Sequence, residues 1–289
     1  MNWLVYHVVS GQAFFTGVAL LVIAAFSSTI DRPGFGRISV LAFLLGVISV
    51  VVSSTALPYW LYLLAAAVTF VWIATRFKTS WRCGAAYATV VVWLLAAAIE
   101  IRFHMTPALS RTDNRSITIV GDSVTAGVHG DGAIETWPVI LAREHQLSVQ
   151  NISRASETAA SALKRVKSHE ITASLVLVEI GGNDVLGSTT LVNFERDLDA
   201  LLGYLTAPDR QVVMFELPLP PFYHEYGRIQ RTIAAKHKVA LVPKWFFLSV
   251  IANRNSTLDT IHLSQSGHQL MADSVWRLIK SAFGTEQAD

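Results

Sequence analysis

Long apolar stretches dominate the first third of the chain. Four runs, each close to the ~20 residues that a helix needs to cross a hydrocarbon core, are separated by short polar segments. They cover residues 3–27, 37–57, 59–75 and 83–101. Only TALPYW separates the second run from the third, and its Pro58 suits a tight hairpin. The pattern predicts an all-α, four-helix transmembrane region over residues 1–105.

A different pattern begins at residue 112, where short β-branched runs alternate with segments whose apolar residues recur at helical spacing. The predicted strands lie at 116–121, 147–153, 174–182, 211–218 and 239–243. The predicted helices lie at 157–169, 190–205, 224–238 and 265–283. Strands that alternate with helices of this length indicate βαβ units. Residues 112–289 are therefore predicted to form an α/β domain with a parallel sheet covered on both faces.

Charge follows the same division. Residues 1–105 contain eight Asp, Glu, Lys or Arg residues, whereas residues 106–289 contain 36. The net charge is +2, and no Lys/Arg cluster is interleaved with aromatic residues, which argues against a nucleic-acid partner. The single Cys83 can form no intramolecular disulfide, and no set of ligands has convincing metal-site spacing.

Basic residues in the loops between the apolar runs predict the orientation. Those between the first and second runs and between the third and fourth are Arg32, Arg37, Arg76, Lys78 and Arg82. The positive-inside rule places these two loops in the cytoplasm and both termini outside. Residues 3–27 are favoured as a retained helix over a signal peptide, because no Lys or Arg precedes them and the run is long. The prediction is a multi-pass plasma- or inner-membrane protein whose α/β domain faces the periplasm or the cell exterior.

The stretch SITIVGDSVTAGVHG, residues 116–130, holds the first candidate for chemistry. An apolar strand runs into Gly-Asp-Ser, and Ser123 there can be either a helix N-cap or a nucleophile. Serine after a strand is an ordinary way to begin a helix. This stretch alone therefore favours the cap, and the other motifs must decide.

Two further motifs follow predicted strands. EIGGNDV, residues 179–185, combines glycines with the amide donor of Asn183, and LDTIHLSQSGHQLM, residues 258–271, places Asp259 three residues before His262. Taken singly, they could be an Asn-Asp turn and a surface ion pair. Ligands gather at the carboxyl ends of parallel strands. Together with Ser123, the motifs supply a nucleophile, a stabilising amide, a base and an acid that orients the base, which is what acyl transfer requires.

Residues 116–284 resemble the SGNH (GDSL) hydrolase family, through GDSVTAG, GGND and DTIHLSQSGH. The resemblance implies a flavodoxin-like parallel sheet, with Ser123 as nucleophile, His262 as general base and then acid, and Asp259 as the partner that orients His262. It also implies an oxyanion hole next to Ser123. The hole would be formed by the backbone N–H of Ser123, the side chain of Asn183 and the backbone N–H at position 156, with Asp122 and Gly182 in support.

The family's second motif is altered in this chain. A pattern of Asn-x-Gly-x-x-Gly-x-Thr is expected, but residues 151–158 read NISRASET, so that Ser153 and Ser156 replace the glycines. A backbone N–H survives a Gly→Ser change, and Ser156 can complete the hole if a non-glycine residue can adopt the required backbone conformation. His268, six residues beyond His262, is expected to be structural.

These observations predict a membrane-anchored serine esterase that hydrolyses a carboxylic ester through an acyl-enzyme, with no cofactor and no metal. The ester is predicted to be a lipid, or an O-acyl or O-acetyl group on an envelope molecule. The apolar segments 217–226 and 244–248 are candidates to contact an acyl chain. Two alternatives stay open: an O-acyltransferase with the same triad acting on an envelope glycan or lipid, and a non-catalytic membrane scaffold with a degenerate hydrolase domain.

Overall fold

The computed structural model describes residues 2–76, 80–112, 114–127, 134–187, 189–253, 255–259 and 261–283. The described residues form two compact units: a helical unit, residues 2–104 with 219–224, and an α/β unit, residues 105–218 with those from 225 onward. Lys78 of the predicted orientation signal and Thr260 of the DTIH motif lie outside the described residues.

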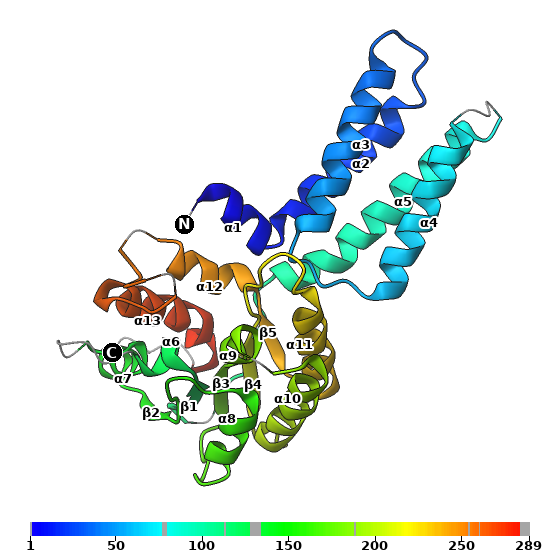
Figure 1. Cartoon of the computed structure of the whole chain (residues 1–289). Coiled ribbons are helices and arrows are strands. Elements are labelled where there is room, and N and C mark those ends of the chain that lie inside the picture. The colour runs from blue at the N-terminus through cyan, green and yellow to red at the C-terminus, as the bar shows by residue number, and fades with distance from the viewer. Residues whose placement is uncertain are drawn as a thin grey trace. The chain divides into compact units, whose positions relative to one another are not determined.

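Within the described residues of the α/β unit, five parallel strands form one sheet in the order β2-β1-β3-β4-β5 (Figure 1). The strands are β1 (Ser116–Gly121), β2 (Ser148–Asn151), β3 (Leu175–Glu179), β4 (Gln211–Phe215) and β5 (Ala240–Val242). Each lies inside a segment predicted from sequence. The predicted parallel-sheet α/β fold is confirmed, and this strand order is the flavodoxin-like one.

Helices cover both faces of this sheet, which explains why its central strands are continuous apolar runs. One face packs against α8 (Ala159–Val166), α10 (Leu191–Leu205) and α11 (His224–Lys236) through a shared buried cluster that includes Val176, Val178 and Met214. Figure 1 shows α12 (Lys244–Ile251) and α13 (Gln265–Ile279) on the opposite side of the sheet from α10 and α11.

Several helices of the α/β unit were not predicted from the sequence. They are α6 (Ser123–Ala126), α7 (Trp137–His145), α9 (Gly182–Leu186) and α12. The 3-10 turn η2 (Lys280–Phe283) continues α13 within the segment predicted as one helix, residues 265–283. Both α6 and α9 are single turns, too short to show a period. Six of the eight residues of α12 are buried, so it has no polar face to mark helical spacing.

The helical unit consists of α1 (Trp3–Val9), α2 (Gln12–Ser27), α3 (Phe35–Val52), α4 (Tyr59–Thr75), α5 (Arg82–Ile101) and the 3-10 turn η1 (Arg102–His104). Small residues allow α2 and α3 to pack closely. A Cβ at Gly17 would lie 2.8 Å from the carbonyl oxygen of Gly46, and a Cβ at Gly46 would lie 3.0 Å from that of Gly17. The paired glycines let the two backbones touch, as is common between membrane helices.

The structure does not establish the predicted count of four spans. Among the described residues, two helices, Phe35–Val52 and Arg82–His104, are long and apolar enough to cross a membrane by length and composition. The first predicted span is not one continuous helix, because α1 and α2 meet at an 85° bend beside Gly11, whose φ is +84°. Counting that bent pair as one span gives up to three, and α4, with 17 residues, is a shorter apolar helix.

Large apolar side chains cover the exterior of these helices. They include Leu41, Ile48, Leu63, Phe70, Val91 and Leu94, each more than half exposed. A water-soluble helical bundle places its polar residues outside. This helical unit therefore has the surface expected of one in contact with lipid.

Candidate active site

The predicted site residues gather where β1 and β3 end. The two strands pair in parallel with Gly121 opposite Glu179, so the segments that follow them begin side by side. The chain goes from β1 to β2 on one side of the sheet and then to β3 on the other, which makes this the topological switch point where ligands bind in such folds. Ser123 and Asn183 come from the two sides of this point.

Ser123 is the first residue of α6, and Asp122 caps that helix. The Oδ1 atom of Asp122 accepts a hydrogen bond from the backbone N–H of Val124 at 3.0 Å. Because Asp122 makes the capping contact, the hydroxyl of Ser123 is left to interact elsewhere. It lies 3.2 Å from Nε2 of His262.

A tight loop holds Asp259 and His262. Residues Thr257 and Leu263 form an antiparallel bridge, and the N–H of Leu258 donates to the carbonyl of His262 at 2.8 Å, which closes the loop on itself. Ser264 then caps α13 by accepting a hydrogen bond from the N–H of Gly267. Asp259 and His262 thus lie within the segment that the bridge closes, immediately before the cap of α13.

Asp259 binds His262 through both carboxylate oxygens. Its Oδ2 lies 2.6 Å from Nδ1 of His262, and its Oδ1 accepts hydrogen bonds from the backbone N–H groups of Ile261 and His262. The contact with the imidazole, followed by these N–H groups, holds the pKa of Asp259 well below its usual range. An ionised Asp259 fixes the Nδ1–H tautomer of His262, which leaves Nε2 as the acceptor that faces Ser123.

Asn183 lies beside this group with both amide hydrogens engaged. Its Nδ2 donates to Oδ2 of Asp122 at 3.2 Å and to the carbonyl of Glu157 at 3.0 Å. Gly181, with φ +110°, begins the turn that brings Asn183 here. Gly182 lies against Asp122, because a Cβ on it would come within 3.1 Å of Oδ2. An oxyanion can receive a hydrogen bond from Asn183 only if one of its present acceptors gives way.

Ser156 has a left-handed backbone, which glycine adopts without strain. Its φ is +61°, in the left-handed region, and the residue is exposed. Its backbone N–H has no hydrogen-bond acceptor among the described residues. Position 156 therefore keeps a free donor despite the loss of glycine.

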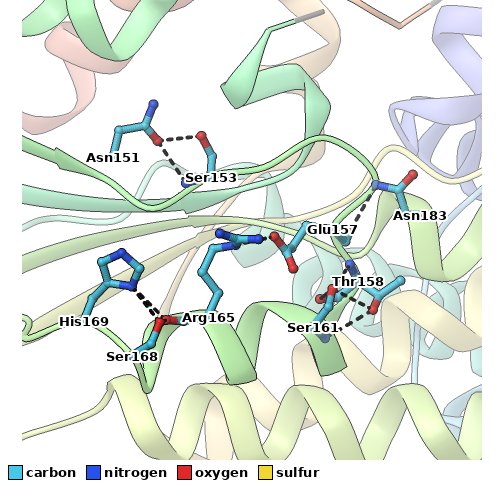
Figure 2. Close-up of polar contacts among 9 residues, drawn as sticks. All are labelled: Asn151, Ser153, Glu157, Thr158, Ser161, Arg165, Ser168, His169 and Asn183. Atoms are coloured by element: carbon cyan, nitrogen blue, oxygen red, sulfur yellow. Dashed lines mark hydrogen bonds and ion pairs between the residues drawn. The ribbon is translucent and has the colours of Figure 1, made fainter.

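Figure 2 shows contacts of Asn151, Ser153 and Glu157, which flank position 156 in the chain. Before this position, Oδ1 of Asn151 accepts hydrogen bonds from the backbone N–H and the hydroxyl of Ser153. After it, the carboxylate of Glu157 pairs with Nε of Arg165 at 2.7 Å, while the carbonyl of the same residue accepts from Asn183. The loop is thus fastened on both sides of position 156.

Glu179 is a site residue that the sequence reasoning missed. It ends β3 with only 4% of its surface exposed, and its Oε2 accepts hydrogen bonds from the hydroxyl of Thr125 at 2.8 Å and the N–H of Asp122 at 3.4 Å. Burial raises the pKa of Asp122 to about 6 and the pKa of Glu179 well above its ordinary value. An acidic residue inside the apolar run LVLVEIGG was the signal available in the sequence.

His268 lies outside the hydrogen-bonded group. It is 1% exposed, its Nδ1 accepts the backbone N–H of Trp137 at 3.2 Å, and burial lowers its pKa to about 4. The contact joins α13 to the start of α7. Among the described residues, no group of three or more His, Cys, Asp or Glu is arranged to hold a metal ion.

Two curated relatives resemble the chain. Esterase TesA of Pseudomonas aeruginosa is 27% identical over an alignment of 180 residues, and the match covers 57% of this chain and 88% of the relative. Thioesterase 1/protease 1/lysophospholipase L1 of Escherichia coli is 28% identical over an alignment of 171 residues, and the match covers 55% of this chain and 80% of the relative.

Solved structures share the fold. The crystal structure of TesA matches with a TM-score of 0.50 at 25% identity, over 58% of this chain and 99% of that one. The psychrotrophic esterase EstA from Pseudoalteromonas matches with a TM-score of 0.52 at 23% identity, over 58% of this chain and 98% of that one.

The sequence profile of the GDSL-like lipase/acylhydrolase family matches residues 119–270, which is more than half of the 289 residues. The chain therefore belongs to the GDSL-like lipase/acylhydrolase family, the SGNH hydrolases, and is a serine ester hydrolase.

Proposed function

We propose that the chain is a membrane-anchored esterase in which Ser123 is the nucleophile, His262 the general base and Asp259 the group that orients His262. The observation that carries the proposal is the hydrogen-bonded series from Oγ of Ser123 to Nε2 of His262 at 3.2 Å, and from Nδ1 of His262 to Asp259 at 2.6 Å. These are the contacts by which an activated serine is recognised.

The reaction proceeds in two halves. Nε2 of His262 takes the proton of the Ser123 hydroxyl as Oγ forms a bond to the ester carbonyl carbon. The bond from that carbon to the alcohol oxygen breaks, and the departing alcohol receives the proton from His262. Water then gives a proton to His262 as its oxygen attacks the acyl carbon. The bond from the acyl carbon to Oγ then breaks, the carboxylic acid leaves, and His262 returns its proton to Oγ of Ser123.

Three donors are proposed for the oxyanion of each tetrahedral intermediate. The N–H groups of Ser123 and Ser156 have no acceptor among the described residues and are available as they stand. The third donor, Nδ2 of Asn183, must exchange one of its two present acceptors for the substrate oxygen. A donor of this kind typically contributes about 10²- to 10³-fold to kcat.

The proposed substrate is an acyl ester of a membrane lipid. The helical unit carries an apolar exterior, and two of its helices are long enough to span a bilayer, which tethers the hydrolase of the same chain to lipid. The relatives are named as an esterase and as a thioesterase and lysophospholipase. An outward-facing α/β unit and a cytoplasmic location of the basic loops are part of this proposal. Water is the acyl acceptor in this proposal.

The test compares the detergent-solubilised protein with its Ser123→Ala variant on p-nitrophenyl esters from acetyl to palmitoyl and on a lysophospholipid. We expect the variant to lose about 10³-fold or more of kcat, and the wild type to prefer long chains. A fluorophosphonate should label the wild type and spare the variant. Full activity in Ser123→Ala would overturn the mechanism, and a Ser123-dependent preference for acetyl would overturn the lipid substrate.

A further inference from the structure

Two buried carboxyl groups lie directly behind Ser123, and the proposed reaction uses neither as a reacting group. Asp122 follows β1 and is 3% exposed, while Glu179 ends β3 and is 4% exposed. Their adjacency follows from strand register, which sets Gly121 opposite Glu179. We call these two residues the carboxyl pair.

The carboxyl pair connects α6, the helix that begins at Ser123, to the side-chain amide of Asn183. On one side, Oε2 of Glu179 accepts from the hydroxyl of Thr125 in α6 and from the N–H of Asp122. On the other side, the carboxylate of Asp122 accepts from the N–H of Val124 and from Nδ2 of Asn183. A hydrogen-bonded series therefore runs from α6 through Glu179 and Asp122 to Asn183.

No cation forms an ion pair with either member among the described residues. The charged groups whose fields reach Asp122 are Glu179, His262 and Asp184. Two adjacent buried carboxylates cannot both ionise at low cost, so the pair holds a proton. Both carboxylate oxygens of Asp122 accept hydrogen bonds, from Val124 and Asn183, whereas only Oε2 of Glu179 accepts any among the described residues. This pattern assigns the negative charge to Asp122 and the proton to Glu179, whose pKa is raised by burial and by the neighbouring Asp122.

We propose that Glu179 is a positioning residue: as a neutral carboxylic acid it donates to Asp122, holds the Asp122 carboxylate between α6 and Asn183, and thereby aims the Asn183 amide at the substrate oxygen. The inference rests on the proposed function, because it concerns the oxyanion hole of that same reaction. Hydrogen bonds to a charged acceptor are about twice as strong as neutral ones. Asn183 should therefore keep its bond to Asp122 and release the carbonyl of Glu157 when the oxyanion forms.

The proposal has a consequence in alkaline solution. Loss of the Glu179 proton would put two like charges side by side in a buried site and remove the donor that holds Asp122. The amide of Asn183 would lose its alignment, and kcat would fall as pH rises. Glutamine at position 179 can still donate to Asp122 and accept from Thr125, but it has no proton to lose in this range.

The experiment measures kcat and KM on a short p-nitrophenyl ester across neutral and alkaline pH, with the Ser123→Ala rate subtracted. Glu179→Gln should stay within about 3-fold of the wild type at neutral pH and lack the alkaline decline. Glu179→Leu, which has similar volume and no hydrogen bonds, should lose about 10²-fold in kcat with little change in KM, the effect of losing one oxyanion donor. Thermal melting in detergent shows whether each variant is folded.

An alkaline decline in Glu179→Gln like that of the wild type would overturn the proposal, as would wild-type kcat in folded Glu179→Leu. If Glu179→Leu does not fold, the pH profile of Glu179→Gln decides alone. Failure of the proposed function is separable, because it would appear as retained activity in Ser123→Ala. If Ser123→Ala is inactive while both variants at position 179 have the kcat and pH profile of the wild type, only the role of Glu179 is rejected.

Discussion

Ser123 and Asp122 are both favoured N-cap residues, and their order in the sequence does not say which one caps α6. In the structure Asp122 accepts the N–H of Val124, and the hydroxyl of Ser123 meets His262 from 139 residues further along the chain. The choice between cap and proposed nucleophile at Ser123 thus depended on its neighbour and on a distant loop. Local sequence preference identifies Asp122 and Ser123 as possible N-caps, but it does not indicate which one caps α6 and which one contacts His262.

At the residue scale, Ser156→Gly should stabilise the protein and leave catalysis intact. A left-handed backbone costs an L-residue about 1–2 kcal/mol, and glycine avoids that cost. We expect the free energy of unfolding to rise by about 1 kcal/mol, with kcat unchanged because the backbone N–H remains. Ser153→Gly, at a negative φ in the same loop, is the matched control and should give no gain. If the free energy of unfolding rises in neither variant, the left-handed backbone at Ser156 carries no strain.

His268 should make stability depend on pH. Burial lowers its pKa in the folded protein to about 4, whereas the unfolded side chain has an ordinary value of about 6.5. Between these values the unfolded chain binds more protons, so the free energy of unfolding rises with pH in that window and falls on acidification. Below pH 4 the loss in the free energy of unfolding from His268 is complete and amounts to roughly 3 kcal/mol.

The measurement compares melting temperatures of the wild type and His268→Asn at pH 7 and pH 4.5. Asparagine can still accept the N–H of Trp137 but does not titrate. The melting temperature of the wild type should therefore fall relative to that of His268→Asn at the lower pH. Asp122 and Glu179, whose raised pKa values act in the opposite direction, are present in both proteins and cancel from the difference. The same difference in melting temperature at both pH values would contradict the lowered pKa of His268.

At the element scale, the start of α13 fixes the loop that carries Asp259 and His262. A Cβ at Gly267 would lie 1.9 Å from the carbonyl oxygen of Ser256, which itself accepts the N–H of Ser264 at the base of that loop. Only glycine permits this approach of helix and loop. The glycine in the SQSGH motif thus has a packing reason that the sequence did not reveal.

Gly267→Ala should therefore displace the loop. We expect a loss of about 1–3 kcal/mol in the free energy of unfolding, as for overpacked interiors, and at least about a 10-fold fall in kcat because Asp259 and His262 move relative to Ser123. Asp273→Ala, an exposed change on the same helix, is the control and should leave kcat unchanged. Wild-type kcat in Gly267→Ala would mean that the loop holds its position without this contact.

At the scale of the whole molecule, the two units differ in where they place apolar side chains. The α/β unit encloses them between sheet and helices, and the helical unit also exposes them. Among the described residues, two helices are long and apolar enough to span a membrane, or up to three if the bent pair is one span, where the sequence predicted four. The apolar runs do not record the bend at Gly11 or the residue at which α4 ends, so the runs alone do not fix the number of spans.

A membrane-integral protein should stay in the membrane fraction during alkaline carbonate extraction and need detergent for release. The apolar exterior of the helical unit provides the physical reason, since its transfer to water would be unfavourable. A reporter fused after Asp289 should be active only outside the cytoplasm if the basic loops are inside. Release by carbonate would contradict the anchor, and a reporter active in the cytoplasm would contradict the orientation.

The sequence by itself determined the division between apolar helices and α/β unit, the positions of the strands, and the residues of the family motifs. Those features depend on local composition and on hydrophobic periods that short windows of sequence record. Only the tertiary structure decided that Asp122 caps α6, that Glu179 joins it behind Ser123, and that Asn183 has both amide hydrogens engaged. These contacts come from strand register and loop closure, which bring together residues far apart in the chain.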